Sequence, residues 1–279
     1  MRHAYLIITH NEFEVLQRLV SALDDERNDI YIHFDKKVKA LPKISVSRSK
    51  LFILKNRIDV RWGTVRQIEC EYTLWEEALK IGQYDYYHMI SGVHYPLKRI
   101  EEIDNFFSGM NGQSVLMPIE ESCEYQETLK LKRYNLFLKH YQSHNRYLKA
   151  ASQFLWKSAI AVQRILSIYT NKSEAFHKSA NWCSLNDECV KYLIENKSHI
   201  LKKYRWSLCG DEYFVPSELL QSRLKGMITE SDKLLHHKIG RANADTFTIA
   251  DYDELIGSEC LFARKFKSSC INIIDKLSL

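Results

Sequence analysis

The chain has 279 residues, of which 45% are hydrophobic and 12% aromatic, with nine Gly and four Pro, a composition that excludes disordered, collagen-like and disulfide-stapled proteins. Its 40 basic and 35 acidic residues give a formal net charge of +5, but the stretch from Thr128 to Lys178 alone holds ten basic residues and one acidic residue. Subtracting these from the totals leaves 30 basic and 34 acidic residues, a net charge of −4, so a near-neutral body carries one basic segment.

Short apolar runs alternate with helical patterns over the first 120 residues. The runs predict buried strands over residues 4–9, 30–34, 50–55, 86–90 and 114–118. Apolar residues spaced three and four apart predict amphipathic helices over residues 14–23 and 65–81. This alternation is typical of an α/β fold, in which a mostly parallel sheet is flanked by helices on both faces.

Ligands of such a sheet bind beyond the carboxyl ends of its strands. The residues in that position are Thr9–His10, Asp35–Lys36, Trp62–Gly63 and Ser91–Gly92. Glycine there lets a ligand approach the backbone closely, and a Trp ring offers a flat apolar face to a sugar or a base. A turn glycine beside a core Trp is the other interpretation of the Trp-Gly pair.

Strand patterns stop from about residue 121 to 180, where long, basic, aromatic-rich helical patterns predict a helical insertion. Beyond it, the sequence predicts helices over residues 186–196, 215–225 and 249–256 and a strand over 260–263. Thr248 or Asp251 is the expected N-cap of the last helix. Because no repeat, low-complexity tract or Pro/Gly-rich linker divides the chain, we expect a single domain over residues 1–279.

Seven scattered cysteines without a Cys-x-x-Cys pair argue against a disulfide framework and a zinc ribbon, and favour a reducing compartment. The apolar run at residues 4–9 is shorter than a signal-peptide core, and no stretch of about 18 apolar residues occurs. We therefore expect a soluble or peripheral protein in the cytoplasm, including the inner face of the membrane.

Several familiar catalytic fingerprints are absent, which argues against P-loop hydrolysis, dinucleotide redox chemistry, zincin proteolysis and α/β-hydrolase activity. Two histidine pairs suggest a metal at first sight. The adjacent His236 and His237 face different directions, and His140 with His144 lacks a nearby third ligand, so we expect no zinc site.

Five motifs occur in a fixed order along the chain. They are Tyr31–Lys36, Val60–Thr64, Met89–Lys98, Gly210–Phe214 and Leu261–Phe266. Together they resemble the core-2/I-branching β-1,6-N-acetylglucosaminyltransferase family, which also contains the peptide O-xylosyltransferases. The resemblance covers nearly the whole chain, which looks like a compact bacterial-type member without the stem and membrane anchor of its secretory relatives.

The resemblance implies a GT-A-type fold and an inverting transfer from a UDP-sugar to an acceptor hydroxyl, without a divalent metal or other cofactor. Glu212 matches the family's catalytic base. Inversion in one displacement needs one carboxylate to take the proton from the attacking hydroxyl while the diphosphate leaves from the opposite face. Spacing alone allows another interpretation, in which Asp211 and Glu212 cap the following helix.

The resemblance also implies that fixed cations neutralise the departing diphosphate. Lys265 matches the family lysine at that position. The second cation is expected some two dozen residues earlier, where Arg241 is nearest by spacing, with Lys238 and Arg264 as rivals; an ordinary exposed pair is the other interpretation of Arg264 and Lys265. Asp251-Tyr252-Asp253 is interpreted as a helix cap and solvated face, not as a metal-binding Asp-x-Asp motif.

Further residues are expected to line the donor and acceptor cleft. They are Asp35, Trp62, Gly63, Ser91, Gly92, Trp182 and Asp211. Asp35 matches a family position near the nucleotide, although a strand-terminating turn explains it equally well. Trp182 falls in a family motif ahead of the base, and a core position is its alternative. His94 departs from the family, whose relatives usually carry an acid there, and this bears on substrate identity.

The basic segment mixes Lys and Arg with large apolar residues. A solvated helical face packed on the domain is one interpretation, and docking to an anionic inner leaflet is another. Nucleic acid is not expected, because the rest of the chain is net acidic and no motif for reading RNA or DNA occurs.

The sequence therefore predicts a metal-independent, inverting glycosyltransferase that uses a UDP-sugar, with N-acetylglucosamine or xylose as the expected sugar. The expected acceptor is a hydroxyl of a glycan or lipid-linked oligosaccharide during surface polysaccharide assembly. The alternative is a degenerate, non-catalytic transferase fold that docks to membrane or nucleic acid.

Overall fold

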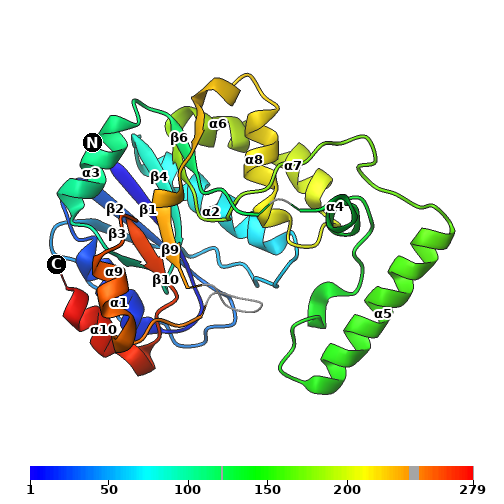
Figure 1. The fold of residues 1–279 in the computed structure, drawn as a ribbon, viewed down its shortest axis with the longest axis horizontal. Helices are drawn as coiled ribbons and strands as arrows, with labels where there is room; N and C mark the ends of the chain where they lie inside the picture. Colours follow the sequence, from blue (N-terminus) through cyan, green and yellow to red (C-terminus); the bar gives the residue numbers. More distant parts are fainter. Residues whose placement is uncertain (121, 239–244, 279) are drawn as a thin grey trace.

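The computed structural model describes residues 1–120, 122–238 and 245–278. A seven-stranded sheet forms its centre (Figure 1). In sheet order the strands are β3 (Lys50–Ile53), β2 (Asn28–Phe34), β1 (His3–Thr9), β4 (Tyr86–Ser91), β7 (Ser184–Asn186), β6 (Ser114–Leu116) and β8 (Ile228–Glu230). Only β7 runs antiparallel to its neighbours, so the predicted α/β class with a mostly parallel sheet is confirmed.

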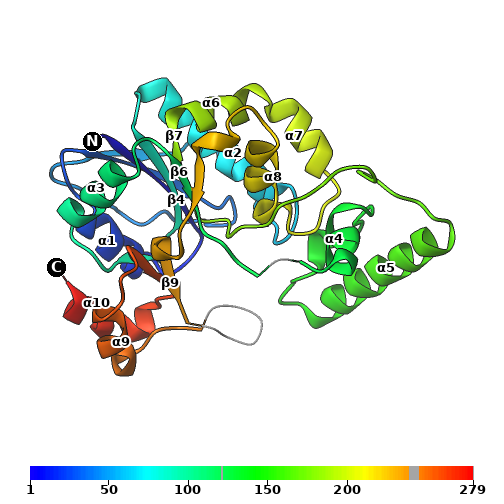
Figure 2. The ribbon, with the colours of Figure 1, turned by 45° about the horizontal axis from the view of Figure 1, so that its top comes forward.

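Helices cover both faces of this sheet (Figures 1 and 2). One face packs against α2 (Arg66–Ile81), α6 (Asp187–Glu195), α7 (Lys197–Tyr204) and α8 (Phe214–Leu220), and the other against α1 (Phe13–Ala22) and α3 (Ile100–Gly109). Strands β1, β2 and β4 are almost wholly buried, which explains why their sequences are continuous apolar runs.

A second, three-stranded sheet lies beside the first, in the order β5 (Tyr95–Pro96), β10 (Phe262–Arg264), β9 (Leu235–His237). It packs with α9 (Tyr252–Ile256) and α10 (Ile271–Leu277), which extend the core around α1. The expected strand over residues 260–263 is confirmed to within two residues, but the sequence did not predict that it belongs to a separate sheet.

Within the described ranges, six short 3₁₀ helices connect these elements. They are η1 (Leu138–His140), η2 (Gly210–Glu212), η3 (Lys225–Met227), η4 (Asp232–Leu234), η5 (Ile249–Asp251) and η6 (Ser268–Cys270). Thr248 is the N-cap residue of η5 and Asp251 is the N-cap residue of α9, so each of the two candidates precedes one of the two short helices that form there.

Residues 122–178 form a projection that we call the helical arm (Figure 1). It contains α4 (Glu124–Leu131), η1 and the 20-residue helix α5 (Arg146–Ile165). An isolated bridge between Pro118 and Ser179 closes its base. The segment predicted as helical therefore does form helices and carries no strand among its described residues.

None of the helices in the described ranges has both the length and the apolar character needed to cross a membrane.

Candidate active site

The ends of three parallel strands meet at one edge of the large sheet, as predicted. The Asp35 amide, just after β2, donates to the Thr9 carbonyl at the end of β1 (2.9 Å), and the Gly92 amide, just after β4, donates to the Ile8 carbonyl (3.0 Å). A Cβ on Gly92 would lie 2.5 Å from Thr9 Oγ1. Glycine is required there so that these two strand ends can approach each other.

Glu212 ends the short helix η2, and its side chain is 34% exposed. Lys130 of α4 places its Nζ 3.8 Å from Glu212 Oε2, so the helical arm contributes a cation beside this carboxylate. The Glu212 carbonyl accepts a hydrogen bond from the Ser179 amide (3.0 Å). The backbone is thus held while the carboxylate stays open to an incoming hydroxyl.

Gln67 links the Trp62–Gly63 turn to the loop that carries Glu212. Its Nε2 donates to Asp211 Oδ2 (2.9 Å), and its Oε1 accepts from the Gly63 amide (2.5 Å). Gly63 has a φ of +71°, and a Cβ there would lie 2.8 Å from Leu208 Cδ1. The turn and the loop are therefore locked together, and the space beside Gly63 is filled by protein.

Two buried carboxyl groups lie behind Glu212. Burial, together with the nearby Glu212 charge, raises the pKa of Asp211 to about 7. Burial, and then the charge of Asp211, raises the pKa of Glu71 well above its usual range. The Asn181 side chain lowers the pKa of Glu71 only in part, so the neutral acid is the form that this site favours.

Trp62 is 45% exposed and stacks on Tyr141 of the helical arm, with ring centroids 5.9 Å apart and planes 12° apart. A cleft of about 280 Å³ opens beside it, lined also by Lys37, Lys139 and His140. The Trp62 ring is therefore available as a flat apolar surface at a polar, basic cleft. Its stacking partner, Tyr141, belongs to the helical arm and not to the large sheet or its covering helices.

Asp35 is buried and paired with Lys37, whose Nζ lies 2.6 Å from Asp35 Oδ2. The same ammonium donates to the Val60 carbonyl (2.6 Å), which ties the end of β2 to the segment before Trp62. In this structure Asp35 orients a lysine, an arrangement that fits both interpretations of the residue.

Arg264 is a largely buried cation that forms no ion pair with another described residue. Its guanidinium carbon lies 5.0 Å from the centre of the Trp182 ring, and its buried Nε has no hydrogen-bond partner among the described residues. Burial alone lowers the pKa of Arg264 from its usual value. An isolated buried cation is unfavourable unless an anion joins it, so this position is suited to an anionic ligand.

The rival cations differ from Arg264 in their surroundings. Lys238 is held by Asp251 at 2.5 Å, so its charge is already matched. Arg241 lies outside the described residues. Lys265 follows Arg264 and is half-buried, and its charge acts on His10, whose pKa is lowered by burial and raised in part by the Asp35 carboxylate. The charge of Lys265 therefore lies within electrostatic reach of His10, which follows β1.

Ser91 and His94 form a buried pair next to Arg264. The Ser91 amide donates to His94 Nδ1 (3.1 Å), and the Ser91 hydroxyl lies 2.7 Å from the same nitrogen. Burial, and then the charge of Arg264, lowers the pKa of His94 well below its usual value. The ring meets Trp182 edge-on at 4.9 Å, so a neutral imidazole holds the tryptophan on which Arg264 rests.

The segment from Ser179 to Trp182 lies between the loop that carries Glu212 and the side chain of Arg264. Ser179 binds the Glu212 carbonyl, and Trp182 lies under Arg264. Three residue steps span at most about 11 Å. The Glu212 backbone and the Arg264 guanidinium therefore contact opposite ends of one short segment.

The Asp-x-Asp sequence at the second sheet serves as a cap. Asp251 Oδ2 accepts from the Thr248 amide (2.7 Å) and hydroxyl (3.0 Å), while its other oxygen binds Lys238. In the described parts of the chain, no three His, Cys, Asp or Glu side chains gather as metal ligands would.

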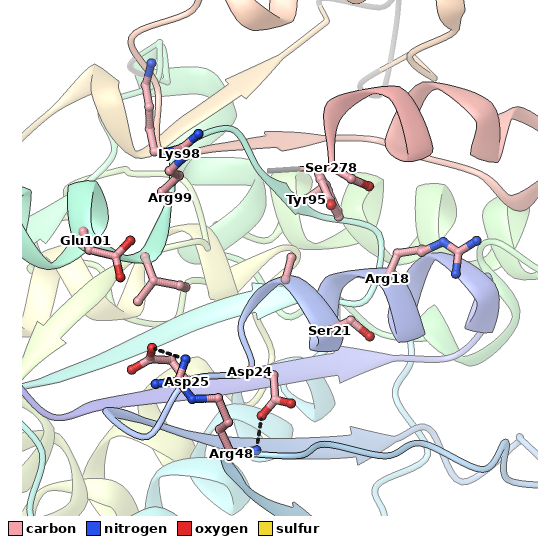
Figure 3. A pocket seen from close by; sticks show the side chains of 12 residues that line it. Arg18, Ser21, Asp24, Asp25, Arg48, Tyr95, Lys98, Arg99, Glu101 and Ser278 are labelled. Carbon is pink, nitrogen blue, oxygen red and sulfur yellow. Dashed lines mark hydrogen bonds and ion pairs between the residues drawn. The ribbon is translucent and has the colours of Figure 1, made fainter.

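A larger cleft of about 530 Å³ lies elsewhere, near the amino end of β2 (Figure 3). Its charged side chains are mostly paired within the protein, including Arg48 with Asp25 (3.3 Å) and Arg18 with Asp275 (2.8 Å). Because it is at the opposite edge of the sheet from the strand ends and most of its charges are already matched, we do not assign the activity to it.

Sequence patterns did not identify Gln67, Glu71 or Lys130 as site residues. Gln67 and Glu71 lie one turn apart on α2, next to the apolar stripe of that helix. Polar residues adjoining a buried stripe are a signal of a buried polar site. No such signal marks Lys130, because its position beside Glu212 depends on how the helical arm packs against the loop that carries Glu212.

Comparisons with known proteins complete the description. The family model described as "Branch: Core-2/I-Branching enzyme" matches residues 3–255. No curated protein sequence gives a match. Among solved structures, 113 chains match. One is the apo form of mouse xyloside xylosyltransferase 1, with 9% identity and a TM-score of 0.41, covering 94% of this chain and 96% of that chain.

Proposed function

Because the chain belongs to the Core-2/I-Branching enzyme family and is a glycosyltransferase, we propose that it moves a sugar from a UDP donor to a glycan hydroxyl, with inversion and without a divalent metal. The family membership predicted from the five sequence motifs is confirmed. A sugar donor and a glycan acceptor follow from membership; the nucleotide, the stereochemistry and the metal independence are the proposal.

Glu212 is the proposed base. Its carboxylate takes the proton of the acceptor hydroxyl as that oxygen forms a bond to the anomeric carbon. The bond from this carbon to the diphosphate oxygen breaks on the opposite face, and UDP leaves with the electron pair. A partly exposed carboxylate on a firmly held loop suits this role, and the raised pKa values of Asp211 and Glu71 reduce the negative charge behind it.

Arg264 and Lys265 are the proposed diphosphate cations. The single observation that supports this most strongly is the largely buried Arg264 side chain, whose buried Nε has no hydrogen-bond partner among the described residues. A fixed cation in a site of low dielectric stabilises the developing charge of the leaving group without reorganising. We assign Arg264 to the position that spacing gave to Arg241.

The remaining residues line the two ends of the cleft. Trp62 would stack on a sugar ring or base, and Trp182 with Ser91 would shape the pocket near the diphosphate. We propose N-acetylglucosamine or xylose as the sugar, and a glycan or lipid-linked oligosaccharide of surface polysaccharide as the acceptor, with the reaction on the cytoplasmic side of the membrane.

A UDP-release screen across UDP-sugars, with free and lipid-linked glycans as acceptors and EDTA throughout, tests the proposal. We expect acceptor-dependent release with one donor, and inversion at the anomeric carbon of the product by NMR. Binding of UDP without transfer from any donor would favour the non-catalytic alternative, and activity that requires added manganese would contradict metal independence.

A further inference from the structure

Helix α5 is apolar on two sides. Its inner side packs on the body of the protein through Trp156 and Ile160, which join Leu208 and Cys209 in one buried cluster. The Trp156 Nε1 donates to Asn135 Oδ1 (2.9 Å). These contacts fix which side of the helix faces outward.

The outer side carries large apolar side chains. Tyr147, Phe154 and Ile165 are 70%, 70% and 81% exposed. They are seven and then eleven residues apart, close to whole numbers of helical turns, so they form one line along the helix. Beside this line lie further exposed residues: Leu148, Leu155, Val162 and, just past the helix, Leu166.

A row of cations borders the apolar line. Arg146, Lys157 and Arg164 are exposed and repeat with the same spacings of eleven and seven residues. The Arg146 guanidinium lies 4.8 Å from the centre of the Tyr147 ring. No acidic residue occurs between residues 146 and 165, so nothing within the helix neutralises this row.

Helix α5 lies at the margin of the molecule in both views (Figures 1 and 2). Isolated exposed apolar residues are ordinary on a protein surface, but a continuous patch of them marks an interaction site. An apolar stripe edged by basic residues matches an interface that is itself apolar below and anionic above, which describes an anionic phospholipid surface.

We propose that the outer face of α5 docks the protein on anionic lipid membranes. Tyr147, Phe154 and Ile165 enter the headgroup region, and Arg146, Lys157 and Arg164 bind lipid phosphates. This surface is separate from the transfer site and goes beyond the proposed reaction. It gives the helical arm a role besides placing Lys130 beside Glu212 and Tyr141 against Trp62.

Flotation with vesicles of phosphatidylglycerol and phosphatidylcholine tests the proposal, with phosphatidylcholine vesicles as the neutral reference. The wild-type chain is expected to bind the anionic vesicles and to be released by salt. We expect the double variant Phe154→Ser/Ile165→Ser, and the triple variant Arg146→Gln/Lys157→Gln/Arg164→Gln, each to lose roughly tenfold or more of this binding.

Ile256→Ser is the matched control, because Ile256 is an exposed isoleucine (55%) outside the helical arm, and it is expected to bind like the wild type. Circular dichroism and a melting curve establish that each variant is folded. Transfer to a water-soluble acceptor should be unchanged in all of them, which separates this inference from the proposed reaction.

Three outcomes would overturn the proposal. They are equal binding of wild type and double variant to anionic vesicles, a concentration-dependent dimer that Phe154→Ser/Ile165→Ser abolishes, and retardation of RNA or DNA with no vesicle binding. The second outcome would assign the face to another copy of the chain, and the third to nucleic acid.

Discussion

The strand-end site and the helical arm both present basic side chains, but in opposite settings. Arg264 is largely buried and has no counter-ion among the described residues, whereas Arg146, Lys157 and Arg164 are exposed beside apolar side chains. The charge of a buried cation affects both the stability of the fold and the affinity for an anionic ligand. Each cation of an exposed row contributes only a little to binding an anionic surface, and the contributions add up along the row.

The difference shows that net charge alone says little about function. The sequence is most basic in the helical arm, yet the cations assigned to the reaction lie outside that segment. What separates the two regions is desolvation, so substitutions in the site should alter chemistry, ligand affinity and stability, and substitutions on the arm's outer face should alter only attachment to a surface.

The largest effect is expected for Glu212→Gln. The amide cannot accept the acceptor proton, so transfer should fall by about 10³-fold while UDP binding changes little. Steady-state release of UDP and calorimetry check the two parts separately. Glu188→Gln, a change of an exposed glutamate on α6, is the control. If Phe154→Ser on the helical arm lowers turnover as much as Glu212→Gln does, the two regions do not have the separate roles assigned to them.

The pH dependence of stability should reveal the buried acid of the site. The pKa of Asp211 is about 7 in the folded protein against a usual value of 3.8. As pH rises from about 4 to 7, the unfolded chain loses this proton first, so the free energy of unfolding should fall, by roughly 1.4 kcal/mol per pH unit at its steepest, and then level off.

Asp211→Asn removes this titration, since the amide does not ionise. Urea unfolding at pH 5, 6, 7 and 8 should show the variant gaining stability relative to the wild type up to about pH 7. Parallel curves for the two proteins would contradict the assignment of a buried, protonated carboxyl behind Glu212.

Arg264→Met sharpens the comparison because its two effects have opposite signs. Removing an unpaired buried charge should raise the melting temperature of the ligand-free protein. The same change should weaken UDP binding by roughly 10- to 100-fold, since charge-assisted hydrogen bonds to the diphosphate are lost. Lys157→Met on the arm is the control, and it should leave both quantities unchanged.

The smallest effect concerns the turn beside Trp62. Gly63→Ala and Gly112→Ala both place a side chain at positive φ, +71° and +79°, but nothing lies within 4 Å of a Cβ at Gly112. Both variants should lose about 1 kcal/mol of stability from backbone strain. Gly63→Ala should lose about 1 kcal/mol more, because its Cβ meets Leu208; equal losses in urea unfolding would refute the close approach.

Much of the fold could be predicted because the central strands are buried on both faces and their helices are amphipathic. The second sheet could not, because β5 has two residues and β9 and β10 have three each, too few to show a period. Helix α3 was also missed, although Glu102 marks its start by accepting a hydrogen bond from the Arg99 amide (2.9 Å).

The positions of Asp35 and Ser91 at strand ends could be predicted from the strand pattern, and a motif singled out Glu212; the roles of these residues stay predictions. The lack of a counter-ion at Arg264 could not be predicted, since pairing depends on which elements fold against one another. The stacking of Trp62 on Tyr141 has the same cause, because the partner comes from the helical arm, 79 residues later.

Calorimetric titration of UDP into the EDTA-treated wild type and the Arg264→Met variant tests the central claim most directly. The account predicts that the wild type binds UDP in EDTA and that the variant binds it much more weakly. Wild-type binding that disappears in EDTA and returns with manganese, or equal affinity in the two proteins, would contradict it.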